Sequence, residues 1–218
     1  WSRKLHAMAG ELALRDIDAQ EKPIKVFFDG PYGEPMVDIQ GDTYSHILLI
    51  AGGMGITPML SQWSSLRDQF SRGRPLSRVH LVWATKDMDM VHSVTEDAAP
   101  QSTVAVANND TAAHVFRADV YNTSPGPDDR HFIPDSRCFA GTELSMHQGR
   151  PDLAGTVMAQ MRTLLEQDTT TSAAAGKRVA VMVCGPASLV KDVRMLCDTA
   201  ALTKGAPAFD FHAETFEL

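Results

Sequence analysis

The sequence predicts an α/β protein with a doubly wound parallel sheet, and three observations support this fold class. Short apolar runs that suit strands buried on both faces recur along the 218 residues. Longer segments with apolar residues at helical spacing stand between these runs. The two clearest runs, residues 46–50 and 177–183, each end in a glycine-containing turn that leads into a helix. Such alternation is typical of parallel strands joined by right-handed crossovers.

The first strand and its turn are the most informative stretch of the chain. Ile47 to Ile50 predict a buried strand, and Gly52, Gly53 and Gly55 follow within four positions. Because glycine lacks a Cβ and tolerates positive φ, this turn can bring its backbone close to a bulky anion. A tight turn of any α/β protein is the alternative, since Gly-Gly-x-Gly-x-Thr-Pro departs from the dinucleotide pattern G-x-G-x-x-G.

The next helix is predicted to start at this turn, with Thr57 as the N-cap and Pro58 as the first helical residue. Its free N–H groups and its dipole would then point to the same place as the glycines, which makes the turn an expected anion site. The apolar residues that keep helical spacing are Met59, Leu60, Trp63, Leu66 and Phe70.

The middle of the chain is predicted to continue the alternation with weaker patterns. The expected elements are a strand at 79–84, a short helix at 88–98, strands at 103–107 and 114–121 around a turn at 108–110, and a surface loop at 122–137.

The last third of the chain contains the second clear strand-turn-helix unit. The expected elements are a helix over 153–165, a small-residue loop at 169–176, a strand at 177–183, a helix over 189–197 and a last strand at 208–212.

The N-terminal residues are expected to belong to another domain. Residues 1–15 are amphipathic, 24–28 are a strand candidate, and 36–39 are a further short one. We place the boundary so that 1–40 is a remnant of an upstream domain and 41–218 is the doubly wound domain. The chain opens on Trp without Met, so we expect it to be a piece of a longer protein.

The composition limits the classes of function that this protein can have. The chain is 44% hydrophobic and 22% charged, as is usual for a soluble globular protein. The net charge of −7 argues against a nucleic-acid binder, and no apolar run approaches the roughly 20 residues that span a bilayer. The three cysteines suggest a reducing compartment, and neither they nor the eight histidines have the spacing of a metal site.

Four special stretches fall at predicted strand ends or in loops that lead into helices, where doubly wound sheets bind their ligands. They are Gly52–Thr57, Thr85–Asp87, Gly149–Pro151 and Cys184–Pro186. Their shared location predicts a nucleotide site.

Lys86 and Arg150 bear on the choice of nucleotide. A cation at the end of the second strand suits the 2′-phosphate of NADPH, and an arginine can add a bidentate contact. Asp87 could instead accept a hydrogen bond from the ribose hydroxyl of NADH, and Lys86 could be a solvated lysine without a ligand contact.

Cys184 and Phe216 each have a structural and a functional interpretation. Cys184 is either a buried structural cysteine or a small soft side chain beside a nicotinamide ring. No histidine adjoins it, which argues against thiol catalysis. Phe216 is either a loose terminal aromatic or a ring that covers a flat cofactor.

Five motifs occur in an order that resembles a known family. They are Asp29-Gly-Pro-Tyr-Gly33, Ala51-Gly-Gly-Met-Gly-Ile-Thr-Pro58, Gly149-Arg-Pro151, Cys184-Gly-Pro186 and His212-Ala-Glu-Thr-Phe216. Together they resemble the C-terminal dehydrogenase region of the ferric reductase and NADPH oxidase superfamily, which is similar to ferredoxin–NADP reductase. The resemblance implies a Rossmann-like NADP-binding domain preceded by the end of an FAD-binding β-barrel. Haem would be present only in transmembrane domains of the parent protein. The part given by this chain would lie at the cytosolic face of that membrane.

The resemblance also implies roles for particular residues. Thr57, Cys184 and Phe216 would lie where hydride passes from NADPH to FAD, with Phe216 moving aside. Pro31 would lie near both cofactors at the domain seam, and Lys86, with Arg150, would bind the 2′-phosphate. The implied cofactor-binding residues are Pro31, Gly52, Gly53, Met54, Gly55, Thr57, Pro58, Lys86, Arg150, Pro151, Cys184, Gly185, Pro186 and Phe216.

Three functions remain open at this stage. The leading one is the NADPH-binding part of a transmembrane ferric-chelate reductase, favoured by the run Val190-Lys-Asp-Val-Arg194 and by the residues after Phe216. A superoxide-producing NADPH oxidase is the alternative in the same class. A catalytically silent nucleotide-sensing or docking module is the alternative of another class. The isolated chain is expected to be inactive without the FAD domain.

Overall fold

A computed structural model describes residues 39, 43–97, 109–124, 139–167, 178–202 and 207–214. All of these residues belong to one unit of the chain, Met36–Leu218. The predictions for residues 1–38, which include Pro31 and the barrel remnant, lie outside the described residues, as does the prediction for Phe216. The domain boundary at 40 and 41 therefore stays a prediction.

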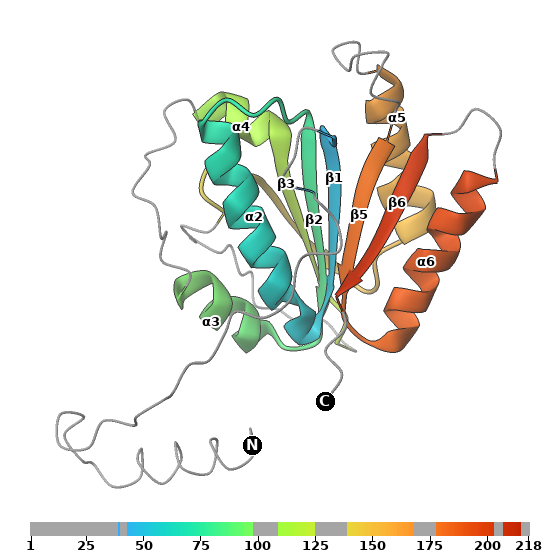
Figure 1. Ribbon diagram of the computed structural model, residues 1–218. Helices are drawn as coiled ribbons and strands as arrows, with labels where there is room; N and C mark the ends of the chain where they lie inside the picture. The colour runs from blue at the N-terminus through green and yellow to red at the C-terminus, as the bar shows by residue number, and fades with distance from the viewer. Residues whose placement is uncertain are drawn as a thin grey trace, which may run out of the picture. The chain divides into compact units, whose positions relative to one another are not determined.

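The described residues form a six-stranded parallel sheet with helices on both sides (Figure 1). The strands are β1 (His46–Gly52), β2 (Arg78–Thr85), β3 (Phe116–Asn122), β4 (Glu143–Gln148), β5 (Arg178–Cys184) and β6 (Ala208–Glu214). The helical elements are η1 (Gly53–Gly55), α2 (Ile56–Ser71), α3 (Met88–Asp97), α4 (Asn109–Val115), η3 (Leu153–Met158), α5 (Ala159–Gln167) and α6 (Ala187–Ala201). The predicted doubly wound α/β fold is confirmed.

The strand order is β4-β3-β2-β1-β5-β6, so the order reverses between β1 and β5. From β1 the chain winds outward to β4, and it then crosses to β5 and winds outward the other way. At such a reversal the loops after the two neighbouring strands diverge to opposite faces and leave a crevice beyond the strand ends. The fold therefore predicts the ligand site at the carboxyl ends of β1 and β5.

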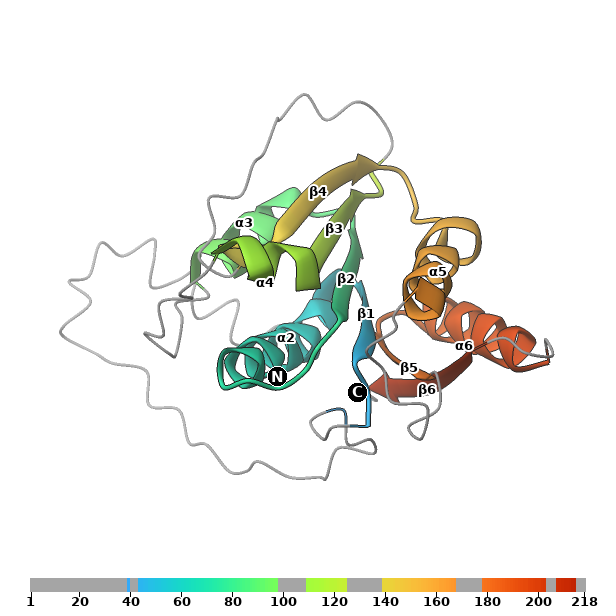
Figure 2. The same ribbon diagram turned by 90° about the horizontal axis from the view of Figure 1, so that it is seen from above.

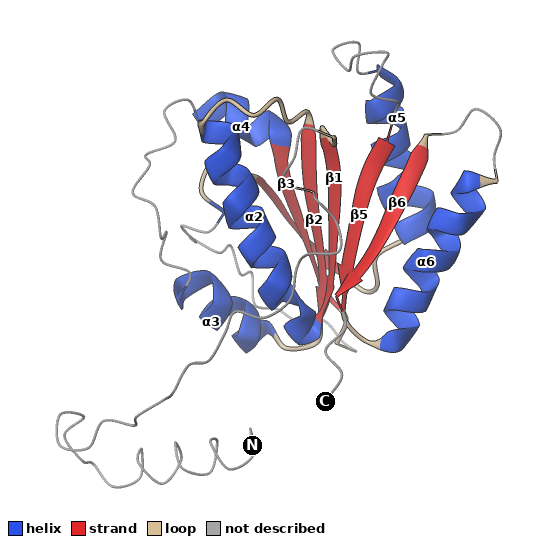
Figure 3. Cartoon of the chain, viewed as in Figure 1, coloured by secondary structure: helices blue, strands red, loops and turns tan. Residues whose placement is uncertain are grey.

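Helices cover the two faces of the sheet in separate groups (Figure 2). Helices α2, α3 and α4 pack one face, with the larger hydrophobic core beneath them. The other face is packed by η3, α5 and α6. Figure 3 shows the sheet as a single layer between these helices.

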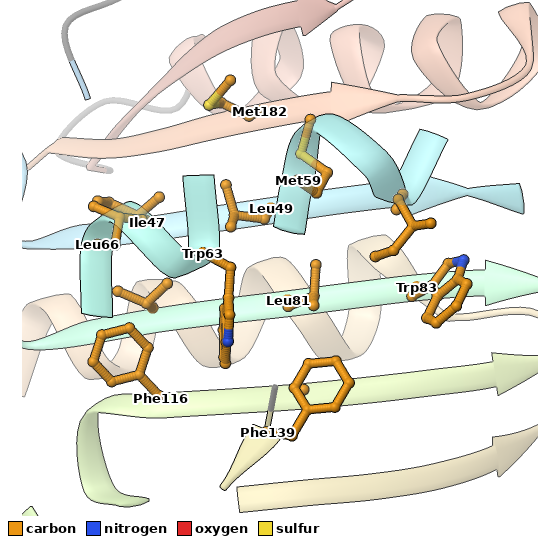
Figure 4. Close-up of a cluster of buried hydrophobic side chains, with 14 of the residues drawn as sticks. Ile47, Leu49, Met59, Trp63, Leu66, Leu81, Trp83, Phe116, Phe139 and Met182 are labelled. Carbon is orange, nitrogen blue, oxygen red and sulfur yellow. The ribbon is translucent and has the colours of Figure 1, made fainter. Parts of the chain in front are cut away.

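Aromatic rings fix α2 against the sheet (Figure 4). Trp63 of α2 meets Phe116 of β3 edge-to-face with 5.2 Å between ring centroids, and it meets Phe139 at 5.9 Å. Phe70 also packs on Phe116, at 5.5 Å. Such edge-to-face pairs are favoured by the ring quadrupoles. They hold the helix in register, and so they fix where its first turn lies relative to the end of β1.

Polar side chains hold the outer strands together on the opposite face. Asp119 of β3 is 3% exposed and contacts three partners. His80 Nε2 lies 2.6 Å from Asp119 Oδ2, and His147 Nε2 lies 3.0 Å from Asp119 Oδ1. Arg117 Nε donates to Asp119 Oδ2 at 2.8 Å. Arg117 also donates to Glu143 at 2.8 Å. These contacts, from β2, β3 and β4, explain how a strand as polar as β4 can pair.

The structure corrects two predictions in the middle of the chain. Residues 109 and 110, predicted as a turn, begin helix α4, and the strand expected from residue 114 begins at Phe116. Asn and Asp favour helix starts as well as turns, which explains the confusion. Strand β4 was not predicted at all, because Leu144 and Met146 are the only apolar residues among its six. The strand expected at 103–107 and most of the loop at 122–137 lie outside the described residues.

The remaining described elements agree with the predictions to within a few residues, and the loop expected at 169–176 lies outside the described residues. The helix expected over 153–165 begins with a π-helical turn, η3, and continues as α5. Strand β6 extends two residues past the predicted end at His212. The described part of residues 36–39 is Ile39 alone, which is a buried turn residue. None of the described helices is both long and apolar enough to cross a membrane.

Candidate functional site

The turns after β1 and β5 pack directly on each other at the strand-order reversal. Ala51 pairs with Cys184 in the parallel register of the two strands. A Cβ added to Gly185 would lie 3.0 Å from both Cα and N of Gly52, and one added to Gly55 would overlap the carbonyl of Cys184. These glycines are therefore required because two backbones approach closely.

Gly53 differs from the other glycines of the turn. Its φ is +54°, and a Cβ added to it would meet no atom within 4 Å. A residue with a side chain is strained at this φ although there is room for it. Next to Gly53, Met54 is 67% exposed. The tip of the turn, Gly53 and Met54, thus faces outward while Gly52 and Gly55 face the neighbouring loop.

The helix start predicted at this turn was two residues late, and the predicted N-cap, Thr57, was wrong. Helix α2 begins at Ile56, its N-cap is Gly55, and Thr57 lies in its first turn. The Thr57 hydroxyl donates to the carbonyl of Met54 at 3.1 Å. The chain enters the helix through the 3₁₀ turn η1, which shifts the start toward the N-terminus. Pro58 still lies in the first turn, where a missing N–H removes no helical bond.

Two helices without capping side chains begin at the carboxyl ends of β1 and β5, where the strand order predicts the ligand crevice. Helices α2 and α6, of 16 and 15 residues, both begin at the lower end of the sheet in Figure 1. Neither has a side chain that caps it, and neither carries an acidic residue in its first turn. By contrast, η3 is capped by Asp152, which accepts from Gly155 N at 2.8 Å. Uncapped N–H groups with a positive helix dipole favour an anionic ligand.

Lys86 and Arg150 lie on the same rim of the sheet. Lys86 directly follows β2, Arg150 follows β4, and both are exposed. The loop after β3 stands between them, and Ser124 in this loop links the two sides. Its hydroxyl donates to the carbonyl of Lys86 at 2.8 Å, and its own carbonyl accepts from the Gln148 side chain at 3.0 Å.

Ser124 is a rim residue that the sequence analysis did not identify. It follows the run Tyr121-Asn-Thr, so polar residues at the end of a third strand were the available signal. Gly149 N donates to the carbonyl of Asn122 at 2.8 Å, which extends the same row of contacts toward Arg150. The strand-end loops therefore form one connected rim.

Asp87, the alternative to Lys86 as the nucleotide-selecting residue, has a structural contact. Its carboxylate Oδ1 accepts from the backbone N–H of Met90 at 3.0 Å, at the start of α3. Its own N–H donates to the Thr85 hydroxyl at 3.1 Å. A carboxylate that receives an N–H from the first turn acts as a helix cap. Asp87 therefore caps the start of α3, and Lys86 is the exposed cation at the end of β2.

Cys184 ends β5 with a buried thiol that is 2% exposed. Burial raises the pKa of the Cys184 thiol, and the charge of Glu214 raises it further. Glu214 stands opposite Cys184 in the β5–β6 register. The thiol therefore stays protonated at neutral pH, which suits a small packing residue and not a nucleophile. Glu214 was not identified from the sequence, since the last strand was expected to end before it.

The structure brings most of the predicted residues to one edge of the sheet. Those at the ends of β1 and β5 and in the turns that follow are Gly52, Gly53, Met54, Gly55, Thr57, Pro58, Cys184, Gly185 and Pro186. Lys86, Arg150 and Pro151 lie on the rim formed by the outer strand ends. Among the described residues, no group of three or more His, Cys, Asp or Glu side chains is placed to hold a metal ion.

A doubly wound sheet with uncapped helix N-termini at its strand-order reversal defines a nucleotide-binding domain of the NAD-binding class. Residues 44–198 match the family described as "Ferric reductase NAD binding domain". The chain belongs to this family, and the resemblance inferred from its motifs is confirmed.

Three proteins to which the chain is similar are named as oxidases. Dual oxidase of Drosophila melanogaster is 24% identical over 88% of this chain, and respiratory burst oxidase homolog protein D of Arabidopsis thaliana is 22% identical over 99% of it. NADPH oxidase 4 of Homo sapiens is 33% identical over 29% of the chain. The chain spans 12%, 26% and 11% of the lengths of these relatives.

Proposed function

We propose that this chain is the NADPH-binding domain of an NADPH oxidase. It would hold NADPH so that hydride passes to FAD, from which electrons would cross a membrane through haem to oxygen. The observation that carries the nucleotide part is the convergence of the glycine turn Gly52–Gly55 with the turn Cys184–Pro186 between two uncapped helix starts. A pyrophosphate is the anion that suits such a crevice in a domain of this class.

The rim residues support NADPH over NADH. Lys86 is exposed at the end of β2, where a dinucleotide domain meets the 2′ position of the ribose. The acid beside it, Asp87, is engaged by the start of α3. Arg150 lies on the same rim and adds a second cation with a fork suited to phosphate. Both cations favour the ligand with the additional phosphate.

The chain's own contribution to hydride transfer is binding and orientation. FAD, in the domain that precedes this one in the proposed parent protein, supplies the hydride acceptor. Cys184 stays a neutral thiol, so a ring can approach the end of β5 without meeting a charge from that side chain. Hydride transfer requires stacked rings at near-attack distance and no general acid or base. We therefore assign Cys184 a packing role beside the nicotinamide.

Oxygen as the acceptor is favoured by the relatives, all of which are named as oxidases. The run Val190–Arg194, which favours a ferric reductase in the sequence, lies within α6. Its polar members Lys191, Asp192 and Arg194 are exposed on that helix, and Arg194 stacks on Phe211 at 4.5 Å. These residues have a surface and packing role that is independent of the acceptor. Ferric-chelate reduction stays the second candidate, because the matching family takes its description from ferric reductases.

The acceptor is tested in the full-length protein that carries this chain. Membranes that contain it are supplied with NADPH, and superoxide output and ferric-chelate reduction are measured side by side, each with and without superoxide dismutase. We expect superoxide to account for most of the NADPH consumed. Chelate reduction that persists in the presence of the dismutase as the dominant product would overturn this part of the proposal.

Nucleotide binding is tested on the 218-residue chain itself. Calorimetric titration of the chain with NADPH and with NADH should show tighter binding of NADPH. Absence of binding of either nucleotide at millimolar concentration would favour a silent docking module instead.

A further inference from the structure

Trp83 connects the hydrophobic core to the glycine turn. It lies near the end of β2 and is fully buried in the cluster beneath α2 (Figure 4). Its indole Nε1–H donates to the carbonyl of Gly53 at 3.1 Å. An indole is a donor only, and a buried one needs an acceptor, so this contact is specific in direction.

The contact fixes the orientation of the peptide between Gly53 and Met54. In a planar trans peptide the C=O and the following N–H point in opposite directions. A Gly53 carbonyl held toward the buried indole therefore directs the N–H of Met54 outward. At a glycine with φ of +54° the adjoining peptide has alternative orientations that a residue with a Cβ would not tolerate. The Trp83 indole adds to the bond from the Ile56 N–H a restraint from outside the turn that favours one of them.

The next peptide of the turn is restrained in the same way. The Met54 carbonyl accepts from the Thr57 hydroxyl at 3.1 Å, and the N–H of Ile56 reaches both carbonyls. Of the three residues whose N–H or O–H groups bond these carbonyls, Trp83 lies on another strand, β2. Lys86 directly follows that strand. Trp83 thus ties the turn at the crevice to the strand that leads to the rim.

We propose that Trp83 is a positioning residue that presets the glycine turn for the pyrophosphate of the nucleotide. Its indole N–H holds the Gly53 carbonyl inward, and the Met54 N–H is thereby presented to a phosphate oxygen before the ligand arrives. A preorganised donor costs no reorganisation on binding, so it increases affinity. This inference rests on the proposed nucleotide function of the crevice.

Trp83→Phe tests the inference because it keeps a buried ring and removes the N–H. The matched control is Leu81→Val, which removes one methylene from an equally buried side chain of the same cluster and the same strand, β2, and which has no polar group that could bond the turn. In the 218-residue chain we expect Trp83→Phe to raise the dissociation constants of NADPH and NADH by the same factor, about tenfold. Leu81→Val should change them by less than about twofold. The NADPH-to-NADH ratio should stay unchanged in both, since the pyrophosphate is common to the two ligands.

Amide hydrogen exchange gives a readout that does not depend on the ligand. Exchange at Met54 and Gly55 should become faster in Trp83→Phe, relative to the strand amides of Leu48 and Leu49, and should not in Leu81→Val. Unchanged turn exchange, or equal losses of affinity in the two variants, would overturn the proposal. If the unsubstituted chain binds neither nucleotide, the proposed function fails, and the exchange comparison still decides whether Trp83 restrains the turn.

Discussion

At the scale of single residues, the glycines of the crevice serve different purposes. Gly52 and Gly55 have no room for a Cβ, because the loop after β5 lies against them. Gly53 has room, but its φ is positive. Trp83 and Thr57 then hold the two carbonyls of the tip. A turn that presents N–H groups to an anion is thus built from steric and hydrogen-bonding restraints on four neighbouring positions.

Lys86 is the residue on which the choice between NADPH and NADH is expected to depend. Lys86→Ala should weaken NADPH binding by about tenfold and NADH binding little, because only NADPH carries the 2′-phosphate. Calorimetric titration of each nucleotide measures both constants. Lys191→Ala, which removes an exposed lysine from α6, is the matched control. Equal losses for the two nucleotides would reject the assignment of Lys86 to the 2′-phosphate.

At the scale of elements, η1 and the first turn of α2 form one rigid connection between β1 and the helix. The loop after β5 packs against Gly52 and Gly55 of this connection, and Trp83 of β2 donates to its Gly53 carbonyl. Helix α2 is in turn held by the contacts of Trp63 and Phe70 with Phe116. The placement of the uncapped helix start therefore depends on the core and not on the turn alone.

Two glycine substitutions should separate close packing from backbone strain. Gly55→Ala should lower the free energy of unfolding by about 3 kcal/mol, because the added Cβ would overlap the backbone of Cys184 and neither backbone can move freely. Gly53→Ala should cost only about 1 kcal/mol, the penalty of a positive φ without a clash. Urea unfolding of both variants provides the measurement. A greater loss in Gly53→Ala than in Gly55→Ala would contradict the packing of the two loops.

At the scale of the whole molecule, the sheet is stabilised differently in its two halves. Apolar side chains fill both faces around β1 and β5. Around β3 and β4, one face depends on the cluster of His80, Arg117, Asp119 and His147. Burial alone would raise the pKa of Asp119, but hydrogen bonds from His80, Arg117 and His147 together hold it far below its usual range. Burial lowers the pKa of His80, and that of His212, below the usual histidine value.

These shifts give the stability of the molecule a defined dependence on pH. Between the lowered pKa of the folded histidines and the unfolded value of about 6.5, the unfolded chain binds more protons, so the free energy of unfolding falls as the pH drops from 7 to 5. Below about pH 4 the same argument applies to Asp119, whose stabilising contribution is lost as the pH falls toward its folded pKa. Urea unfolding at pH 7, 5 and 3.5 measures the profile. A flat profile between pH 7 and 5 would contradict the buried neutral state of the histidines.

Two substitutions assign the profile to the cluster. Asp119→Asn should lower the free energy of unfolding at pH 7 by about 3 kcal/mol, because Arg117 and His80 lose their carboxylate partner. The control Asp68→Asn, which breaks a surface pair with Arg72, should cost less than about 1 kcal/mol. His80→Gln should reduce the slope between pH 7 and 5, since glutamine has no proton to bind in that range.

Much of this fold and site could be predicted from the sequence because the signals are local. The runs that form β1, β2 and β5, and the helices that follow β1 and β5, are each recognisable within one stretch of the chain. Strand β4 could not be recognised, because Glu143 and His147 hold it through partners on another strand, Arg117 and Asp119 of β3. Helix α4 was missed because Asn109 and Asp110 are equally typical of turns.

The sequence by itself determined the strand-turn-helix units, the family, and the glycines and cations at the strand ends, since these depend on residues close together in the chain. Only the tertiary structure decided which of them meet. It places the Gly55 backbone on Cys184, the Trp83 indole on Gly53, the Asp87 carboxylate on the start of α3, and Ser124 between Lys86 and the Arg150 loop. The reason is physical: most of these contacts depend on strand order and register, which long-range packing sets and which no single stretch of sequence encodes.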